Sequence, residues 1–127
     1  MHAINVGTPA GLDNLKLVDV AAQPPGPGEI QVRVRASSLN FHDYVVAIGL
    51  LPVAEARIPM SDGAGVVEAV GEGVTDYKAG DQVMSVFFPD WLDGRCDAAW
   101  KQARIPGDTS EGFATQTVTR EASAFTP

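Results

Sequence analysis

The sequence from 63 to 86, GAGVVEAVGEGVTDYKAGDQVMSV, places two apolar segments between glycine-containing turns. Its valines favour a strand at about 64–71, and Gly71 and Gly73 permit the positive φ angles of a tight reversal. A second glycine turn opens a segment at about 82–88, in which apolar and polar side chains alternate. Two strands joined by turns, with no helical pattern between them, predict an antiparallel β architecture.

The segment EIQVRVRA, at 29–36, is the clearest strand in the sequence. Apolar and polar residues alternate along it with a period of two, which is typical of a strand with one buried face. The pattern predicts that one face carries Ile30, Val32, Val34 and Ala36.

The remaining segments favour the same fold class. We expect strands at 2–6, 15–20 and 112–119, a short helix in 41–51 that Gly49 ends, and an irregular segment at 89–111 with one or two helical turns in DAAWKQAR. Strands at this spacing, without a βαβ rhythm, predict a mainly β fold: a partly open β-barrel with a few short helices.

Length and charge restrict the function classes. With 127 residues we expect one domain, 1–127. Nine basic residues against sixteen acidic ones give a net charge of −7, which argues against nucleic acid or an anionic membrane as a partner. There is no apolar run of membrane-spanning length and no secretory signal pattern. The single cysteine, Cys96, suits a reducing compartment, so we expect a cytoplasmic protein.

Three segments resemble the medium-chain dehydrogenase/reductase family. Residues 63–86 resemble its V-x-x-V-G-x-G-V…G-D-x-V core, and Asn40-Phe41-His42-Asp43 resembles the N-[FY]-x-D motif of its zinc-independent, quinone-oxidoreductase-like members. Residues 87–94, FFPDWLDG, resemble the F-F-x-x-W-x-x-G stretch of zinc-independent NAD(P)-dependent alcohol dehydrogenase-like proteins. The resemblance implies a GroES-like barrel that forms the substrate side of a nicotinamide-dependent oxidoreductase for a small carbonyl, alcohol, enone or quinone.

The family's α/β Rossmann domain, which binds the nucleotide, has no counterpart in this chain. Gly63-Ala64-Gly65 is not a dinucleotide fingerprint, because Glu68 stands at its sixth position and no helix pattern follows. The glycine pair instead predicts close approach of two strands. We therefore expect NAD(P)H to bind the full-length parent, and this chain alone to hold it weakly and to be inactive.

The resemblance also implies roles for four consecutive residues. It implies that Asn40 and Phe41 approach the cofactor, that Asn40 and Asp43 serve the catalytic cleft, and that His42 relays a proton. An unperturbed imidazole titrates near pH ~6.5, which suits a relay. The residues alone allow a plainer interpretation, in which Asn40 caps the helix, Asp43 stabilises its first turn and His42 is structural.

Comparison with zinc-dependent relatives predicts that this chain holds no metal. The alignment puts Asn40 at the position of a cysteine ligand, and Ser61 and Asp62 at the positions of a histidine and a glutamate. Amide and hydroxyl groups are poor zinc ligands beside thiolate and imidazole. The structural zinc lobe of those enzymes needs four cysteines, where this chain offers only Cys96. We expect Ser61 and Asp62 to line the substrate cleft instead.

Phe88 and Trp91 are further candidates for the substrate cleft, since aromatic side chains suit an apolar substrate. The alternative is that they cover the open end of the barrel. At the level of the whole protein, the alternative to an oxidoreductase domain is a stand-alone or truncated GroES-like binding module without activity. In either case the face that would meet a nucleotide-binding domain is expected to be apolar, which allows homo-oligomers.

Overall fold

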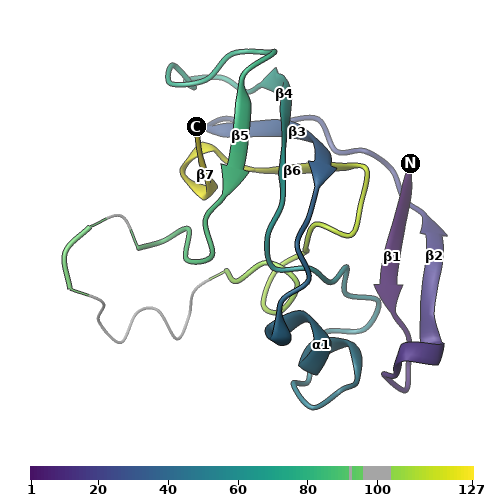
Figure 1. Cartoon of the computed structure of the whole chain (residues 1–127). Coiled ribbons are helices and arrows are strands. Elements are labelled where there is room, and N and C mark those ends of the chain that lie inside the picture. The colour runs from purple at the N-terminus through teal and green to yellow at the C-terminus, as the bar shows by residue number, and fades with distance from the viewer. Residues whose placement is uncertain (92, 96–103) are drawn as a thin grey trace.

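The computed structural model describes residues 1–91, 93–95 and 104–127, and in them the chain folds into strands with one α-helix (Figure 1). The elements are β1 His2–Val6, η1 Leu12–Asn14, β2 Leu15–Asp19, β3 Glu29–Ala36, α1 Phe41–Ala47, β4 Ala64–Val70, β5 Gln82–Ser85, β6 Thr117–Glu121, η3 Ala122–Ala124 and β7 Phe125–Thr126. The α-helix has seven residues, and no helix in the described ranges is long and apolar enough to cross a membrane.

The strands form an antiparallel two-stranded sheet, β1-β2, and an antiparallel five-stranded sheet in the order β6-β3-β4-β5-β7. The strands β6 and β7 lie at opposite edges of the larger sheet, yet only the three residues of η3 join them. The sheet therefore curls until its two edges lie close together (Figure 1). This is the partly open β-barrel that the sequence predicts.

The core lies inside this curled sheet. Its buried members come from β3, β4, β5 and the C-terminal segment: Ile30, Val32, Val67, Val83, Phe113, Val118, Ala124 and Phe125. The predicted alternation along β3 is confirmed at Ile30 and Val32, which are 0% and 1% exposed. It fails at Ala36, which is exposed, because the pairing with β4 shifts register between Val34 and Ala36.

Two predicted strands differ from the structure. The strand predicted at 82–88 ends at Ser85. The strand predicted at 112–119 begins only at Thr117, because Phe113 and Val118 both enter the core. Residues an odd number of positions apart point to opposite faces of a regular strand, so the chain must bend between them.

The predicted positive φ angle is confirmed at Gly73 but not at Gly71. Gly73, with φ 80°, and Gly49, with φ 80° just after α1, take the conformation that favours glycine. Gly71 is needed for a different reason. It is not in the positive-φ region, but a Cβ atom there would lie 1.8 Å from the carbonyl oxygen of Gly26. Cys96 and the predicted helical turns, apart from Arg104, fall outside the described residues.

Candidate functional site

Four of the predicted site residues meet where β3 leaves the sheet and β4 begins. Asn40 precedes α1, Asp43 lies in its first turn, and Ser61 and Asp62 lead into β4. We call Asn40, Asp43, Ser61 and Asp62 the polar cluster. They come from two segments that are separated in the sequence and are joined by hydrogen bonds.

Asp43 connects the helix to the segment before β4. Its side chain is buried, with an exposed fraction of 2%. One carboxylate oxygen, Oδ2, accepts a 2.8 Å hydrogen bond from the backbone N–H of Asn40, within a capping box. The other, Oδ1, accepts a 2.7 Å hydrogen bond from the backbone N–H of Ser61. A buried carboxylate is tolerated when N–H donors replace water in this way.

Asn40 directs its side-chain amide into the cluster. Its Nδ2 donates to Oδ2 of Asp62 at 3.0 Å and to Oγ of Ser61 at 3.3 Å, and also lies 3.2 Å from the carbonyl oxygen of Ser38. The helix-cap and site interpretations of Asn40 are therefore compatible. Its backbone begins the helix, while its side chain orients Ser61 and Asp62.

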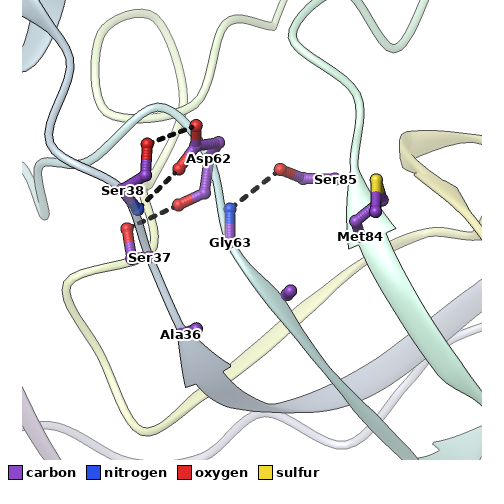
Figure 2. A pocket seen from close by; sticks show the side chains of 8 residues that line it. Ala36, Ser37, Ser38, Asp62, Gly63, Met84 and Ser85 are labelled. Carbon is purple, nitrogen blue, oxygen red and sulfur yellow. Dashed lines mark hydrogen bonds between the residues drawn. The ribbon is translucent and has the colours of Figure 1, made fainter.

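Asp62 lies at the edge of an open pocket of about 290 Å³ (Figure 2). Its Oδ1 accepts a 2.9 Å hydrogen bond from the backbone N–H of Ser38, and its carbonyl oxygen accepts a 2.6 Å bond from Oγ of Ser37. Across the pocket, Oγ of Ser85 accepts a 3.0 Å bond from the backbone N–H of Gly63. The lining residues are Ala36, Ser37, Ser38, Asp62, Gly63, Ala64, Met84 and Ser85.

Ser61 is buried within the polar cluster. It is 1% exposed and is not among the residues that line this pocket. Its hydroxyl accepts a hydrogen bond from Asn40, and its backbone N–H donates to Asp43. The structure thus places Asp62 at a pocket and buries the neighbouring Ser61, and the roles of both in a substrate cleft stay predictions.

His42 lies beside a second group of residues, which includes Asp108 and Phe87. Its Nε2 atom is buried and has no hydrogen-bond partner, and Oδ2 of Asp108 lies 3.9 Å from it. The ring of Phe87 meets the imidazole edge-on, with centroids 5.4 Å apart. Asp108 was not found by sequence reasoning, because nothing in its local sequence indicates that its turn packs against α1.

The aromatic residues predicted for the substrate cleft, Phe88 and Trp91, follow Phe87 in a series of ring contacts that begins at His42. The rings of Phe87 and Phe88 are 4.7 Å apart, and those of Phe88 and Trp91 are 6.4 Å apart. Trp91 is half exposed, and its Nε1 donates to the carbonyl oxygen of Gly94 at 3.2 Å. These residues form a row beside His42. Phe41 lies apart from it, 79% exposed, so its predicted cofactor contact would be made from the surface.

The positions aligned with zinc ligands do come together, as the alignment requires. Their side chains, however, are an amide, a hydroxyl and one carboxylate, and the amide nitrogen of Asn40 is a hydrogen-bond donor. Within the described ranges, no three His, Cys, Asp or Glu side chains are grouped so that they would hold a metal ion.

Residues 26–127 match the family model of the alcohol dehydrogenase GroES-like domain. The chain belongs to this family. It is therefore a GroES-like domain of the medium-chain dehydrogenase/reductase type, as the motifs predict.

Similar proteins include synthases and dehydrogenases. The phthioceranic/hydroxyphthioceranic acid synthase of Mycobacterium tuberculosis (strain ATCC 25618 / H37Rv) is 39% identical over 127 residues, which cover 96% of this chain and 6% of that protein. A cobalt- and zinc-bound thermostable alcohol dehydrogenase from Pyrobaculum aerophilum is 33% identical, with a TM-score of 0.82, over 98% of this chain and 40% of that one. A quinone oxidoreductase of Pseudomonas syringae pv. Tomato DC3000 is 28% identical, with a TM-score of 0.74, over 98% and 32%.

Two facts follow from these comparisons. The chain spans less than half the length of each of these proteins. The structural neighbours include a metal-bound enzyme. Whether this chain holds zinc therefore depends on the ligand types of its own residues.

Proposed function

We propose that this chain is the substrate-side domain of a zinc-independent, NAD(P)H-dependent oxidoreductase that acts on a small carbonyl, alcohol, enone or quinone. The observation that carries the proposal is the polar cluster. At the positions where zinc-dependent relatives place their ligands, this chain has an interlocked set of hydrogen-bonding groups beside a pocket.

The chemistry of the cluster supports zinc independence. A catalytic zinc needs about three protein ligands that offer lone pairs. Here Asn40 offers an N–H donor toward Asp62, and Ser61 is a buried hydroxyl. Binding a metal would require breaking these hydrogen bonds and would gain one good ligand, Asp62.

The pocket supports binding of part of a cofactor or a small substrate. At about 290 Å³ it is near the lower end of ligand sites, which span roughly 300–1,000 Å³. That volume suits one ring and its substituents, not a whole dinucleotide. A nicotinamide bound there would supply hydride, while Asp62 and the hydroxyl of Ser85 would orient its polar groups or those of the substrate. The phosphates would lie on another domain of a longer parent.

The acid-synthase relative favours one class among the substrates. A synthase of an acid makes a product with a carbonyl group, and an enone-like double bond conjugated to a carbonyl accepts hydride at carbon. We therefore favour a conjugated acyl or enone substrate in a cytosolic, multidomain parent. A GroES-like binding module without activity is the second candidate, because this chain covers only a small share of its relatives.

The test uses the full-length protein after dialysis against a chelator. We expect oxidation of NADPH or NADH with an enone, quinone or aldehyde, and far less than one zinc per chain by elemental analysis. Activity that chelation removes and zinc restores would contradict the zinc-free mechanism. Failure to oxidise either cofactor with every substrate would favour the binding module.

A further inference from the structure

The pocket beside Asp62 contains a hydroxyl group whose proton is not used within the described structure. Ser37, Ser38 and Ser85 line this pocket with hydroxyl groups. Oγ of Ser37 donates to the carbonyl oxygen of Asp62 at 2.6 Å, and Oγ of Ser38 lies 3.5 Å from Oδ2 of the same residue. Oγ of Ser85 instead accepts a hydrogen bond, from the backbone N–H of Gly63 at 3.0 Å, and donates to no group in the described ranges. Since a hydroxyl both donates and accepts, Ser85 keeps its proton for a ligand.

The position of the Ser85 hydroxyl is fixed by the pairing of β5 with β4. The backbone N–H of Ser85 donates to the carbonyl oxygen of Gly63 at 2.8 Å, while its Oγ accepts from the N–H of that glycine. Figure 2 shows Ser85 reaching toward Gly63 from one side, with Asp62 on the other side. The two hydrogen bonds hold backbone and side chain, and the hydroxyl hydrogen can still rotate. A donor fixed in this way loses little conformational freedom when a ligand binds.

Apolar atoms form much of the remaining pocket wall. Ala36, Ala64 and Met84 line it at the ends of β3, β4 and β5. A ligand that fills this space leaves water, and a carbonyl oxygen that leaves water needs a new hydrogen-bond donor. Ser85 supplies such a donor. The ligand that fits is therefore a small apolar group that carries a carbonyl oxygen.

Asp62 adds a negative charge at the edge of the same pocket. Its carboxylate accepts hydrogen bonds from the amide of Asn40 and the backbone N–H of Ser38, and both donors are neutral. In the part of the chain that the structure describes, no Lys, Arg or His side chain lies within ion-pair distance of it. Like charges repel more strongly beside apolar walls than in water. An ionised carboxylic acid is therefore disfavoured here, and an uncharged carbonyl compound is not.

We propose that Ser85 donates a hydrogen bond to the carbonyl oxygen of the ligand, and that Asp62 restricts this pocket to uncharged carbonyl compounds. This inference rests on the proposed function, whose substrates it narrows to uncharged enones, quinones, aldehydes and acyl derivatives. Free acids are excluded. The carboxamide of nicotinamide presents the same carbonyl chemistry, so the experiments have to distinguish substrate from cofactor.

The first test is an NMR titration of the 127-residue chain with crotonamide and with crotonate, which share a carbon chain and differ in charge. The reporter is the N–H of Gly63, because a hydroxyl that donates to a ligand becomes a stronger acceptor. We expect crotonamide to shift the Gly63 signal, and crotonate to bind at least about 10-fold more weakly. A Gly63 signal that crotonamide leaves unchanged would overturn the role of Ser85. Equal binding of the two compounds would overturn the role of Asp62.

Two variants with matched controls assign these effects to the side chains. Ser85→Ala should remove most of the crotonamide binding, and Asp62→Asn should bring the affinity for crotonate close to that for crotonamide. The controls are Ser123→Ala, which removes an exposed hydroxyl in η3, and Glu68→Gln, which removes the same charge from β4 outside the pocket. Both controls should bind as the unaltered protein does. Crotonate binding gained equally by Glu68→Gln would show that net charge excludes anions, and would overturn the role of Asp62.

Kinetics of the full-length protein identify whose carbonyl oxygen Ser85 binds. If it is the substrate's, Ser85→Ala should raise KM for cyclohex-2-enone about 3–10-fold, as loss of one neutral hydrogen bond does, and leave KM for the reduced cofactor unchanged. A higher KM for the cofactor alone would assign the same donor to the nicotinamide carboxamide. Unchanged KM values for both, in an active reductase, would overturn the role of Ser85.

The binding and kinetic tests separate this inference from the function on which it rests. A full-length protein that oxidises neither NADH nor NADPH with any substrate would overturn the proposed function. The NMR titration would then still show whether the pocket takes uncharged carbonyl compounds through Ser85. An active reductase whose domain binds crotonate as well as crotonamide would overturn the restriction by Asp62 alone.

Discussion

At the scale of single residues, the members of the polar cluster hold one another in place beside a pocket. Asp43 uses both carboxylate oxygens on backbone N–H groups, so it stabilises the junction of α1 with the segment before β4. Asn40 uses its amide to hold Ser61 and Asp62. Residues that fix one another in this way present a rigid wall to the adjacent pocket.

The first prediction concerns Asn40. We expect Asn40→Ala to lower the free energy of unfolding by about 1–2 kcal/mol, because it removes a cap and the hydrogen bonds that Asn40 donates to Asp62 and Ser61. Asn40→Asp is the matched variant, since it keeps a capping side chain but places a second carboxylate beside Asp62. Its loss of stability relative to the unaltered protein should be larger at pH 7 than at pH 4, where protonation relieves the repulsion. Urea unfolding of both proteins at both pH values measures this, and equal losses at the two pH values would contradict the contact.

The sequence identified part of this site and missed the rest for a physical reason. Asn40, His42 and Asp43 are neighbours in one motif, so local pattern revealed them together. Asp108 reaches His42 only through the packing of a turn far along the chain, which no local pattern encodes. The burial of Ser61 was also unpredicted, because a polar residue before a strand gives no sign that an amide and a carboxylate will enclose it.

At the scale of elements, β3 and β4 lie in close contact. A Cβ atom on Gly65 would lie 2.1 Å from the carbonyl oxygen of Arg33 and 2.8 Å from Cγ1 of Val32. The prediction of close strand approach is therefore confirmed at Gly65. At Gly63 the neighbour is a side chain instead, because a Cβ atom there would lie 2.5 Å from the ring of Phe113. The approach brings the segment that carries Asp62 against the end of β3.

The second prediction follows from that contact. Gly65→Ala should lower the free energy of unfolding by about 3 kcal/mol, since backbone atoms cannot move aside as a flexible side chain does. The control is Gly11→Ala, because Gly11 has extended backbone with φ 162° and nothing within 4 Å of the added Cβ. We expect no loss there. Thermal or urea unfolding distinguishes the two, and similar losses at both glycines would contradict the argument.

Strand positions were predicted best where apolar and polar residues alternate along a strand. The bounds of β3, at 29–36, match because Ile30 and Val32 repeat with a period of two. The predicted start of β6 was wrong because residues 112–116 alternate as a strand does. In the structure they are irregular, and Phe113 enters the core from them. The two residues of β7 were missed because Phe125 and Thr126 are too few to form a pattern.

At the scale of the whole molecule, charge influences stability through ion pairs near the barrel's surface. Arg104 bonds Asp90 at 2.6 Å and also contacts Glu121. The hydrogen bond from Arg104 holds the pKa of Asp90 below its ordinary value. This pair joins the segment after β5 to the segment before the Asp108 turn.

The third prediction is the pH dependence of that pair. Because the folded state lowers the pKa of Asp90, its contribution to stability is present above the unfolded pKa of about 3.9 and is lost as the pH falls through the folded pKa. Both side chains are nearly half exposed, so we expect less than about 1 kcal/mol. Carboxyl carbon NMR should show Asp90 ionised to lower pH than in an Arg104→Met variant. Identical titrations would contradict the assignment.

The fourth prediction concerns the isolated chain and its cofactor. We expect no saturable binding of NADH or NADPH at micromolar concentration, because the net charge is −7 and the pocket has room for only part of a dinucleotide. Nicotinamide fluorescence during titration measures this. Saturation at micromolar cofactor would place a phosphate site in this domain. It would contradict the proposal that the phosphates bind to another domain of the parent.

The placement of β6 and β7 at opposite edges of the larger sheet also has a consequence for the time course of folding. Residue 29 pairs with residue 121, and residue 85 pairs with residue 125. Both edges of the sheet are therefore completed by the same segment, which is synthesised last of these strands. During synthesis, β3 and β5 must keep unpaired edges until that segment leaves the ribosome, and such edges attract other strands. Slow synthesis would lengthen this exposed period, whereas rapid completion or chaperone binding would shorten it. Aggregation of this domain in cells should therefore depend on the rate of translation as well as on its stability.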